Sequence, residues 1–130
     1  MSTTRFGRMT VLTLDLDESK AFYEQAFDFA TLFDGEVAPG WRTVHVGPGD
    51  VHDAGIWLLR AEGSAVERVG SQTAGEPAML LYVDDLDSAL SRLDALGHRP
   101  SREAAGDDAG YRFAHVLDPS GNEIVLVQTP

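Results

Sequence analysis

The feature that most constrains this chain is an internal repeat. The tripeptides Asp15-Leu16-Asp17 and Asp85-Leu86-Asp87 each follow a short apolar run of the kind that forms a β-strand. Each also opens a stretch whose apolar residues recur at helical spacing. Further strand-like runs follow both helices. A unit that occurs twice determines the architecture before any single residue does, and here it predicts two copies of one module with a ligand between them.

The first copy begins with an apolar, β-branched run over residues 9–14, which is typical of a strand. Asp15 or Asp17 can then cap a helix, because a carboxylate accepts hydrogen bonds from the free N–H groups of the first turn. One face of this helix is expected to be buried: Ser19, Phe22, Tyr23, Ala26 and Phe27. Three further strands are predicted at residues 29–34, 41–47 and 55–60, separated by turns that contain glycine or proline.

The second copy repeats this order, with a strand predicted at residues 78–83. The buried stripe of its helix is predicted as Leu86, Ala89, Leu90, Leu93 and Leu96, and Gly97 stands where a C-terminal cap glycine belongs. Residues 98–100 are expected to form at most a short edge strand, because Pro100 has no N–H to donate. A closing hairpin is predicted from residues 111–117 and 123–128. Both copies therefore have the order β-α-β-β-β, and the fold class is α+β.

Length and composition favour one compact domain over residues 1–130. The chain has 130 residues, of which 43% are hydrophobic, enough to bury a core. Residues 1–62 form the first predicted module and residues 77–130 the second. The polar stretch 63–76 is the predicted linker between them.

Charge and cysteine content exclude several classes of function. The net charge of −11 would repel the phosphates of nucleic acid and an anionic membrane face, so neither is an expected partner. The absence of cysteine excludes disulfides, thiolate nucleophiles and cysteine-based metal sites. Residues 1–9 carry no long apolar run that would indicate a signal peptide, and no stretch is long enough for a membrane span. We therefore expect a cytoplasmic protein.

Three local motifs together carry a resemblance to a known superfamily. They are the strand followed by Asp15-Leu16, the Ala21-Phe22-Tyr23 run on the first helix, and the closing sequence Asp118-Pro119-Ser120-Gly121-Asn122-Glu123-Ile124. With the repeat, they make the whole chain resemble the vicinal oxygen chelate superfamily, which contains glyoxalase I, bleomycin resistance proteins and dioxygenases. The resemblance implies two tandem βαβββ modules that form a half-open barrel cup, and a homodimer. Asp28 departs from the pattern, because the superfamily often has glycine there.

The metalloenzymes of this superfamily hold a divalent ion with His, Glu or Gln side chains on four strands. Carried over to this sequence, the four ligand positions fall at Arg8, Trp57, Ala78 and Val125. Arginine brings a fixed positive charge, and the other three side chains offer no lone pair to a divalent cation. We therefore expect neither a metal ion nor another cofactor.

The lining of the cup is predicted from the alternation of side chains along a strand, counted from these four positions. On the third and seventh strands, the choice of which alternating set of side chains faces the cup comes from the resemblance alone. This choice is left open. The candidate ligand-binding residues are Arg8, Thr10, Trp41, Thr43, His45, Trp57, Leu59, Leu80, Tyr82, Phe113, His115 and Glu123. The opposite set should pack against the helices: Val11, Ile56, Leu58, Met79, Leu81, Val83, Ile124 and Leu126. An aromatic cavity with a few polar groups is typical of a small-molecule site.

The polar candidates have alternative interpretations. His45, His115 and Glu123 are the candidate catalytic residues, as general bases or as a relocated metal site. Both histidines can equally be structural residues of the barrel. Arg8 can anchor an anionic group or pair with Glu123.

Three classes of function follow from this pattern. The favoured one is metal-independent binding of a small aromatic or planar organic molecule, as in drug sequestration. The alternative is a lyase, isomerase or dioxygenase-type enzyme that uses relocated His and Glu residues. The third is an accessory domain whose cavity is vestigial.

Overall fold

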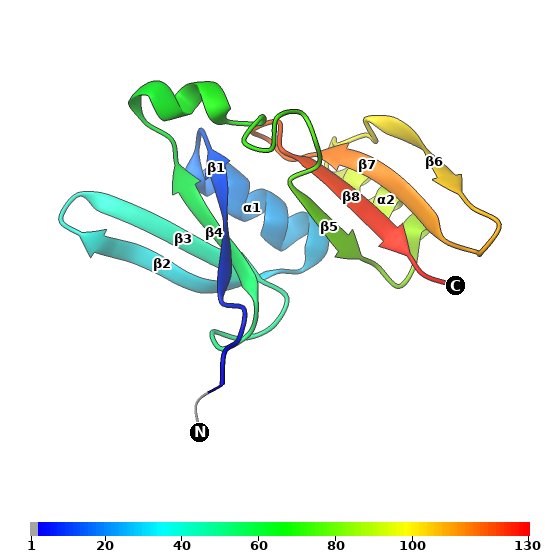
Figure 1. Cartoon of the computed structure of the whole chain (residues 1–130), viewed down its shortest axis with the longest axis horizontal. Coiled ribbons are helices and arrows are strands. Elements are labelled where there is room, and N and C mark those ends of the chain that lie inside the picture. Colours follow the sequence, from blue (N-terminus) through cyan, green and yellow to red (C-terminus); the bar gives the residue numbers. More distant parts are fainter. Residues whose placement is uncertain (1–2) are drawn as a thin grey trace. The chain divides into compact units, whose positions relative to one another are not determined.

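The computed structural model describes residues 3–130, which divide into two compact units, residues 3–67 and residues 68–130. Each unit has one four-stranded sheet and one α-helix (Figure 1). The expected fold class, α+β with tandem βαβββ modules, is confirmed. A 3₁₀ helix, Gly63–Arg68, and a series of turns occupy the predicted linker. No helix among residues 3–130 has the length and apolar character needed to cross a membrane.

The first unit contains the strands β1 (Arg8–Thr13), β2 (Ala30–Ala38), β3 (Trp41–Gly47) and β4 (Gly55–Arg60) and the helix α1 (Leu16–Phe27). The strand order is β1-β4-β3-β2, in which β1 runs parallel to β4 and the other neighbours are antiparallel. The helix packs against β2, β3 and β4 on one face of this sheet (Figure 1). The second strand is longer than the predicted segment 29–34, because it continues through Gly35 to meet the start of β3.

Both ends of α1 follow from the local sequence. The Asp15 carboxylate accepts a hydrogen bond from the Glu18 N–H at 2.9 Å, which makes Asp15 the N-cap of the two candidates. At the other end Asp28 adopts the left-handed conformation, with φ of 57°. This explains the departure from glycine, since aspartate is among the few residues that tolerate the conformation. The buried face holds Phe22 and Tyr23, whose rings meet edge to face.

The second unit contains β5 (Met79–Tyr82), α2 (Leu86–Ala95), β6 (Arg102–Gly106), β7 (Arg112–Leu117) and β8 (Glu123–Gln128). Its strand order, β5-β8-β7-β6, repeats that of the first unit, with β5 parallel to β8. Asp85 caps α2 by accepting from the Ser88 N–H at 3.1 Å, as Asp15 does for α1. The predicted cap glycine Gly97 has φ of 88°, and the next N–H, that of His98, donates to Leu93 O at 2.8 Å. Together with the bond from the Gly97 N–H to Asp94 O at 2.9 Å, this bond forms a Schellman motif.

Two details predicted for the second copy are wrong. Leu96 is not part of the buried stripe: it is the C-cap residue of α2 and 39% exposed, because the helix ends before its side chain can turn toward the sheet. The edge strand is not residues 98–100, which carry no strand, but β6. His98 is occupied by the helix cap and Pro100 cannot donate, so pairing with β7 begins only after them.

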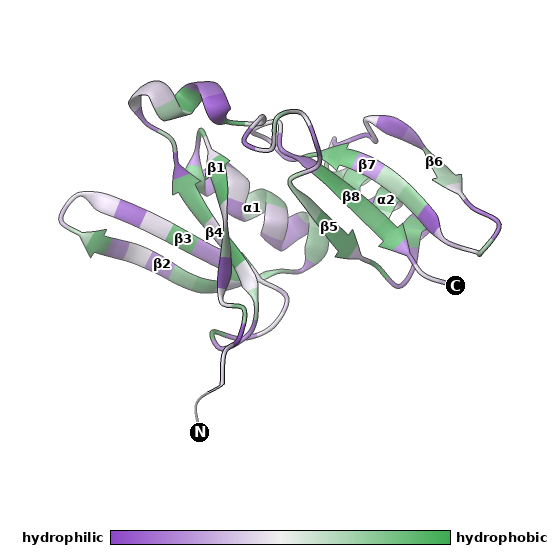
Figure 2. Cartoon of the chain, in the orientation of Figure 1, coloured by the Kyte–Doolittle hydropathy of each residue, from purple (hydrophilic) through white to green (hydrophobic). Residues whose placement is uncertain are grey.

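The helix-facing side chains form the two cores. Of the predicted set, Val11, Ile56, Leu58, Ile124 and Leu126 are buried. Met79, Leu81 and Val83 are only half-buried, because α2 packs mainly against β7 and β8. Figure 2 shows β5 and β8 as hydrophobic along most of their length, whereas polar and apolar residues alternate along β2 and β3. A strand that is apolar on both faces indicates that the face away from α2 is also suited to a partner or ligand.

The turn between β7 and β8 is closed by its own side chains. Asp118 and Asn122 are both buried. The Asp118 carboxylate accepts from the N–H groups of Ser120 and Asn122, each at 2.9 Å, and Gly121 supplies the positive φ of 86° that the turn requires. This hairpin fixes the register that places His115 opposite Val125.

An ion-pair network ties α1 to the β2–β3 hairpin. Asp34 on β2 accepts from Lys20 of α1 and from Arg42 of β3, both at 2.9 Å, and Arg42 also bonds Asp17 of α1 at 2.8 Å. Arg42 and Lys20 hold the pKa of Asp34 well below its usual range. Such a carboxylate stabilises the folded chain above its unfolded pKa of about 4, and this stabilisation is lost as the pH falls below that value.

We expect Asp34→Asn to lower the free energy of unfolding by about 1 kcal/mol at pH 7, because two cations lose their shared partner. The difference from wild type should shrink as the pH falls below about 4, where Asp34 is protonated in the unfolded chain. Urea unfolding at several pH values measures this difference in the free energy of unfolding. Asp17→Asn is the matched control: within residues 3–130 Asp17 forms one ion pair, with Arg42, and it is far more exposed than Asp34, so its loss should be smaller. An equal loss in both variants, or a constant difference at all pH values, would contradict the role assigned to Asp34.

Candidate ligand-binding site

The face of the first sheet that is turned away from α1 carries a row of side chains, one from each strand. Thr10 of β1 lies opposite Trp57 of β4, Trp57 opposite His45 of β3, and His45 opposite Phe33 of β2. The His45 ring centroid lies 5.9 Å from that of Trp57 and 5.4 Å from that of Phe33. Three rings therefore form a continuous, half-buried aromatic surface, which we call the aromatic row. Such a surface suits a flat apolar molecule.

Thr43 holds the indole of Trp57 in place. The Trp57 indole N–H donates to the Thr43 hydroxyl, which in turn donates to Leu58 O at 3.3 Å. Thr43 is only 1% exposed. Its hydroxyl is thus used to position the ring, in contrast to the direct contact with a ligand that the sequence predicts for it. A buried indole N–H needs such a partner, and the bond leaves the ring only limited freedom to rotate.

Arg8 is bound to the sheet and to a neighbouring loop. Its Nε donates to His45 Nδ1 at 3.0 Å, and its two terminal nitrogens donate to the backbone carbonyls of Gly7, Val51 and Asp53 at 2.8–3.1 Å. Four of the five N–H donors of the guanidinium are therefore used. Arg8 can still contribute its charge to an anionic ligand, but little direct hydrogen bonding. The alternative partner Glu123 belongs to the other unit.

His45 is an uncharged histidine in this setting. Burial and the neighbouring Arg8 charge both lower its pKa, burial being the larger cause. Its Nδ1 lone pair is engaged by Arg8, so this nitrogen is available neither to a metal ion nor as a general base. Among the two candidate catalytic histidines, the geometry thus argues against His45.

The second sheet has a comparable open face. Leu80 and Tyr82 of β5 are 50% and 73% exposed, although both are large and largely apolar. Across the sheet, Phe113 pairs with Val127 and His115 with Val125. Monomeric proteins seldom expose apolar side chains side by side in this way without a function. The predicted inward parity of the seventh strand agrees with this arrangement, since its alternate residues Ala114 and Val116 are buried.

His115 and Glu123 form a pair on this face. The Glu123 carboxylate lies 3.5 Å from His115 Nδ1, and both side chains are less than one-fifth exposed. Nδ1 is buried and makes no hydrogen bond within residues 3–130. A carboxylate beside an imidazole nitrogen can orient the ring for proton transfer.

The four positions that the resemblance assigns to the superfamily's metal ligands lie on strands or directly beside one. Arg8 begins β1, Trp57 is within β4, Val125 is within β8, and Ala78 directly precedes β5 and donates its N–H to Glu123 O at 2.8 Å. None of these side chains is a suitable ligand. No group of three or more acidic, histidine or cysteine side chains arranged to hold a metal ion occurs in the described part of the chain.

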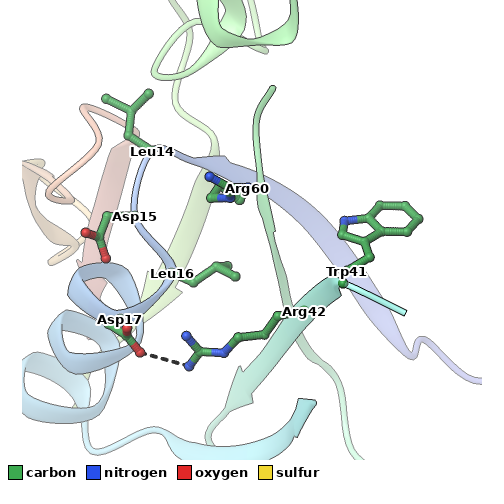
Figure 3. Close-up of a pocket in the computed structure, with 8 residues that line it drawn as sticks. Leu14, Asp15, Leu16, Asp17, Trp41, Arg42 and Arg60 are labelled. Carbon is green, nitrogen blue, oxygen red and sulfur yellow. Dashed lines mark hydrogen bonds and ion pairs between the residues drawn. The ribbon is translucent and has the colours of Figure 1, made fainter. Parts of the chain in front are cut away.

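Trp41 and Leu59, the remaining candidates of the first unit, differ in position. Trp41 is 49% exposed and lines a surface depression of about 290 Å³ with Gly40, Arg60 and the start of α1. Figure 3 shows the Trp41 ring and the Arg42 side chain leaving the hairpin in different directions, with Arg42 bonded to Asp17. The two arginines of this depression already form ion pairs, Arg42 with Asp17 and Arg60 with Glu62. Leu59 is half-buried on β4, at the alternating position two residues after Trp57.

Sequence reasoning missed Phe33. The sequence pattern assigns no inward face to the second strand, so it does not predict Phe33 as a site residue. The pairing of Phe33 with His45 depends on register shifts on both sides, at residues 31–33 and 36–38. A local pattern does not reveal such shifts, although the hairpin turn at Gly40 predicts that β2 and β3 pair.

Comparison with known proteins identifies the family. Residues 5–126 match the Glyoxalase/Bleomycin resistance protein/Dioxygenase superfamily. The chain belongs to this superfamily, as the repeat and the closing hairpin predict. A search of curated proteins finds no significant match.

Solved structures of similar fold include an antibiotic binding protein and a glyoxalase I. TnmS3, an antibiotic binding protein from Streptomyces sp. CB03234, is 25% identical with a TM-score of 0.77, over 100% of this chain and 99% of that one. TioX from Micromonospora sp. ML1 is 14% identical with a TM-score of 0.70, over 98% of this chain and 100% of that one. The trypanothione-dependent glyoxalase I of Leishmania major is 20% identical with a TM-score of 0.76, over 97% of this chain and 87% of that one. The last two likenesses concern the fold alone.

Proposed function

We propose that this protein binds a small planar or aromatic organic molecule without a metal ion, in the manner of a drug-sequestering protein. The observation that carries the proposal is the aromatic row, in which Trp57, His45 and Phe33 form one surface, with Thr43 bonded to the Trp57 ring and Arg8 to the His45 ring. A preformed apolar surface with a few fixed polar atoms is the usual composition of a small-molecule site.

Two further observations support this proposal. Arg8, Trp57, Ala78 and Val125 supply no set of lone pairs for the superfamily's divalent ion. The likeness to TnmS3, whose described activity is antibiotic binding, covers the whole chain. The candidate residues of the second sheet, Leu80, Tyr82, Phe113, His115 and Glu123, stay predictions for a ligand site on that sheet.

A fluorescence titration tests the proposal. In the Trp41→Phe variant Trp57 is the remaining tryptophan, so quenching reports on the aromatic row. We expect 2-naphthoate or N-methylacridinium to quench it saturably, with the same Kd for chelator-treated and zinc-supplemented protein. Loss of binding on chelation would indicate a metal-dependent site. Absence of quenching by any flat aromatic compound would count against the aromatic row as a binding surface.

An enzymatic function is the second candidate, and the His115–Glu123 pair favours it. Such a pair could abstract a proton in a lyase or isomerase reaction. Incubation of bound compounds with wild type and His115→Ala, followed by mass spectrometry of the products, separates the two functions. Turnover that requires His115 would favour the enzyme. The homodimer and the cytoplasmic location stay predictions, and light scattering at micromolar concentration checks the first.

A further inference from the structure

The two ring nitrogens of His45 are in different situations. Nδ1 accepts a hydrogen bond from the Arg8 Nε–H at 3.0 Å, and an arginine N–H can only donate. Nδ1 must therefore be unprotonated. An uncharged imidazole carries its single proton on the other nitrogen, so Nε2 is the N–H of this ring. Of the two ring nitrogens of His45, only Nδ1 makes a hydrogen bond to a group within residues 3–130.

The partner that selects this tautomer is itself held independently of His45. The terminal nitrogens of Arg8 donate to Gly7 O at 2.9 Å, to Asp53 O at 2.8 Å and to Val51 O at 3.1 Å. The guanidinium is therefore fixed beside the imidazole before any ligand arrives. Protonation of Nδ1 would break the bond and place two positive charges in contact. The lowered pKa of His45 agrees with this arrangement.

We propose that His45 is a fixed, uncharged hydrogen-bond donor that selects, among flat aromatic molecules, those with an acceptor such as a carbonyl oxygen at the ring edge. The inference deepens the proposed function and rests on it. Trp57 and Phe33 lie on either side of His45 and would contact the rings of the ligand, while Nε2–H would meet its oxygen. A ligand with an N–H donor at that edge would face a donor and be disfavoured.

Nitrogen NMR of the free protein tests the tautomer without any ligand. With ¹⁵N-labelled histidine at pH 7, Nδ1 of His45 should have the chemical shift of an unprotonated nitrogen and Nε2 that of a protonated one. The signals are assigned by their loss in His45→Phe. In Arg8→Met the same ring should show a mixture of tautomers, because the selecting donor is gone. A protonated Nδ1 in the wild type, or an unchanged spectrum in Arg8→Met, overturns the inference.

Calorimetric titration with three matched probes tests the selection. Fluorenone-4-carboxylate has a carbonyl oxygen at the ring edge, fluorene-4-carboxylate a methylene group, and carbazole-4-carboxylate an N–H. One neutral hydrogen bond corresponds to a factor of roughly three to ten in Kd, so wild type should bind the fluorenone that much more tightly than the fluorene. The carbazole should be the weakest of the three.

The variants distinguish the possible failures. In His45→Phe the preference for the fluorenone should disappear while the fluorene is still bound, because the aromatic contact is retained. His52→Phe makes the same change at an exposed histidine and should behave as wild type. Equal affinities of wild type for all three probes would leave the proposed function intact and overturn this inference alone. If wild type bound none of the probes, the proposed function would fail, and the selection with it.

Discussion

Leu93→Ala is expected to lower the free energy of unfolding by about 2–5 kcal/mol. Leu93 is fully buried on α2, which packs against β7 and β8. Truncation removes apolar atoms from the core and leaves a cavity that the surrounding side chains can fill only partly. The same residue's carbonyl accepts the capping bond from His98, so the backbone around it is already constrained and cannot easily collapse into the space. Chemical denaturation, fitted as a two-state transition, measures the loss.

Leu96→Ala is the matched control. It removes the same atoms three residues further on, at the C-cap of α2, where the side chain is 39% exposed. Its cost should be below about 1 kcal/mol, as is usual for substitutions near the surface. Similar costs at both positions would mean that the helix is rotated or extended relative to the structure described here.

Trp57→Ala is expected to weaken ligand binding by at least tenfold. Stacking between aromatic rings contributes about 0.5–1.5 kcal/mol beyond simple burial, and the area lost with the indole adds to this. The variant also frees the Thr43 hydroxyl, so circular dichroism and an unfolding curve must accompany the binding measurement. Isothermal titration calorimetry with fluorene-4-carboxylate gives the Kd, because the variant has lost its fluorescent reporter.

Two further variants test whether a weaker Kd in Trp57→Ala comes from loss of the aromatic face at this position. Trp57→Phe keeps an aromatic face and should lose less affinity than alanine. Trp41→Ala removes a ring of the same type from the surface depression beside α1, and binding at the aromatic row should change little. If Trp41→Ala lowered affinity as much as Trp57→Ala, the ligand would lie at the β2–β3 hairpin and the aromatic row would not be the site.

Local patterns in the sequence were sufficient for the architecture. Two Asp-Leu-Asp caps, two helical stripes and a closing turn with Asp118, Gly121 and Asn122 all act within a few residues of each other along the chain. Such short-range interactions depend little on the rest of the fold, so the order β-α-β-β-β, its repetition and the superfamily were predictable. Alternation along the strands was also enough to separate the buried Leu58 from its half-buried neighbour Trp57.

The chemistry of the candidate site was decided by tertiary structure. Arg8, His45 and Trp57 were all expected in the cup, but their roles depend on contacts between residues far apart in the sequence. Which nitrogen of His45 carries the proton depends on Arg8, which is held by the loop carbonyls of Val51 and Asp53. A residue type sets which hydrogen bonds are available, whereas only the register of neighbouring strands sets which of them form.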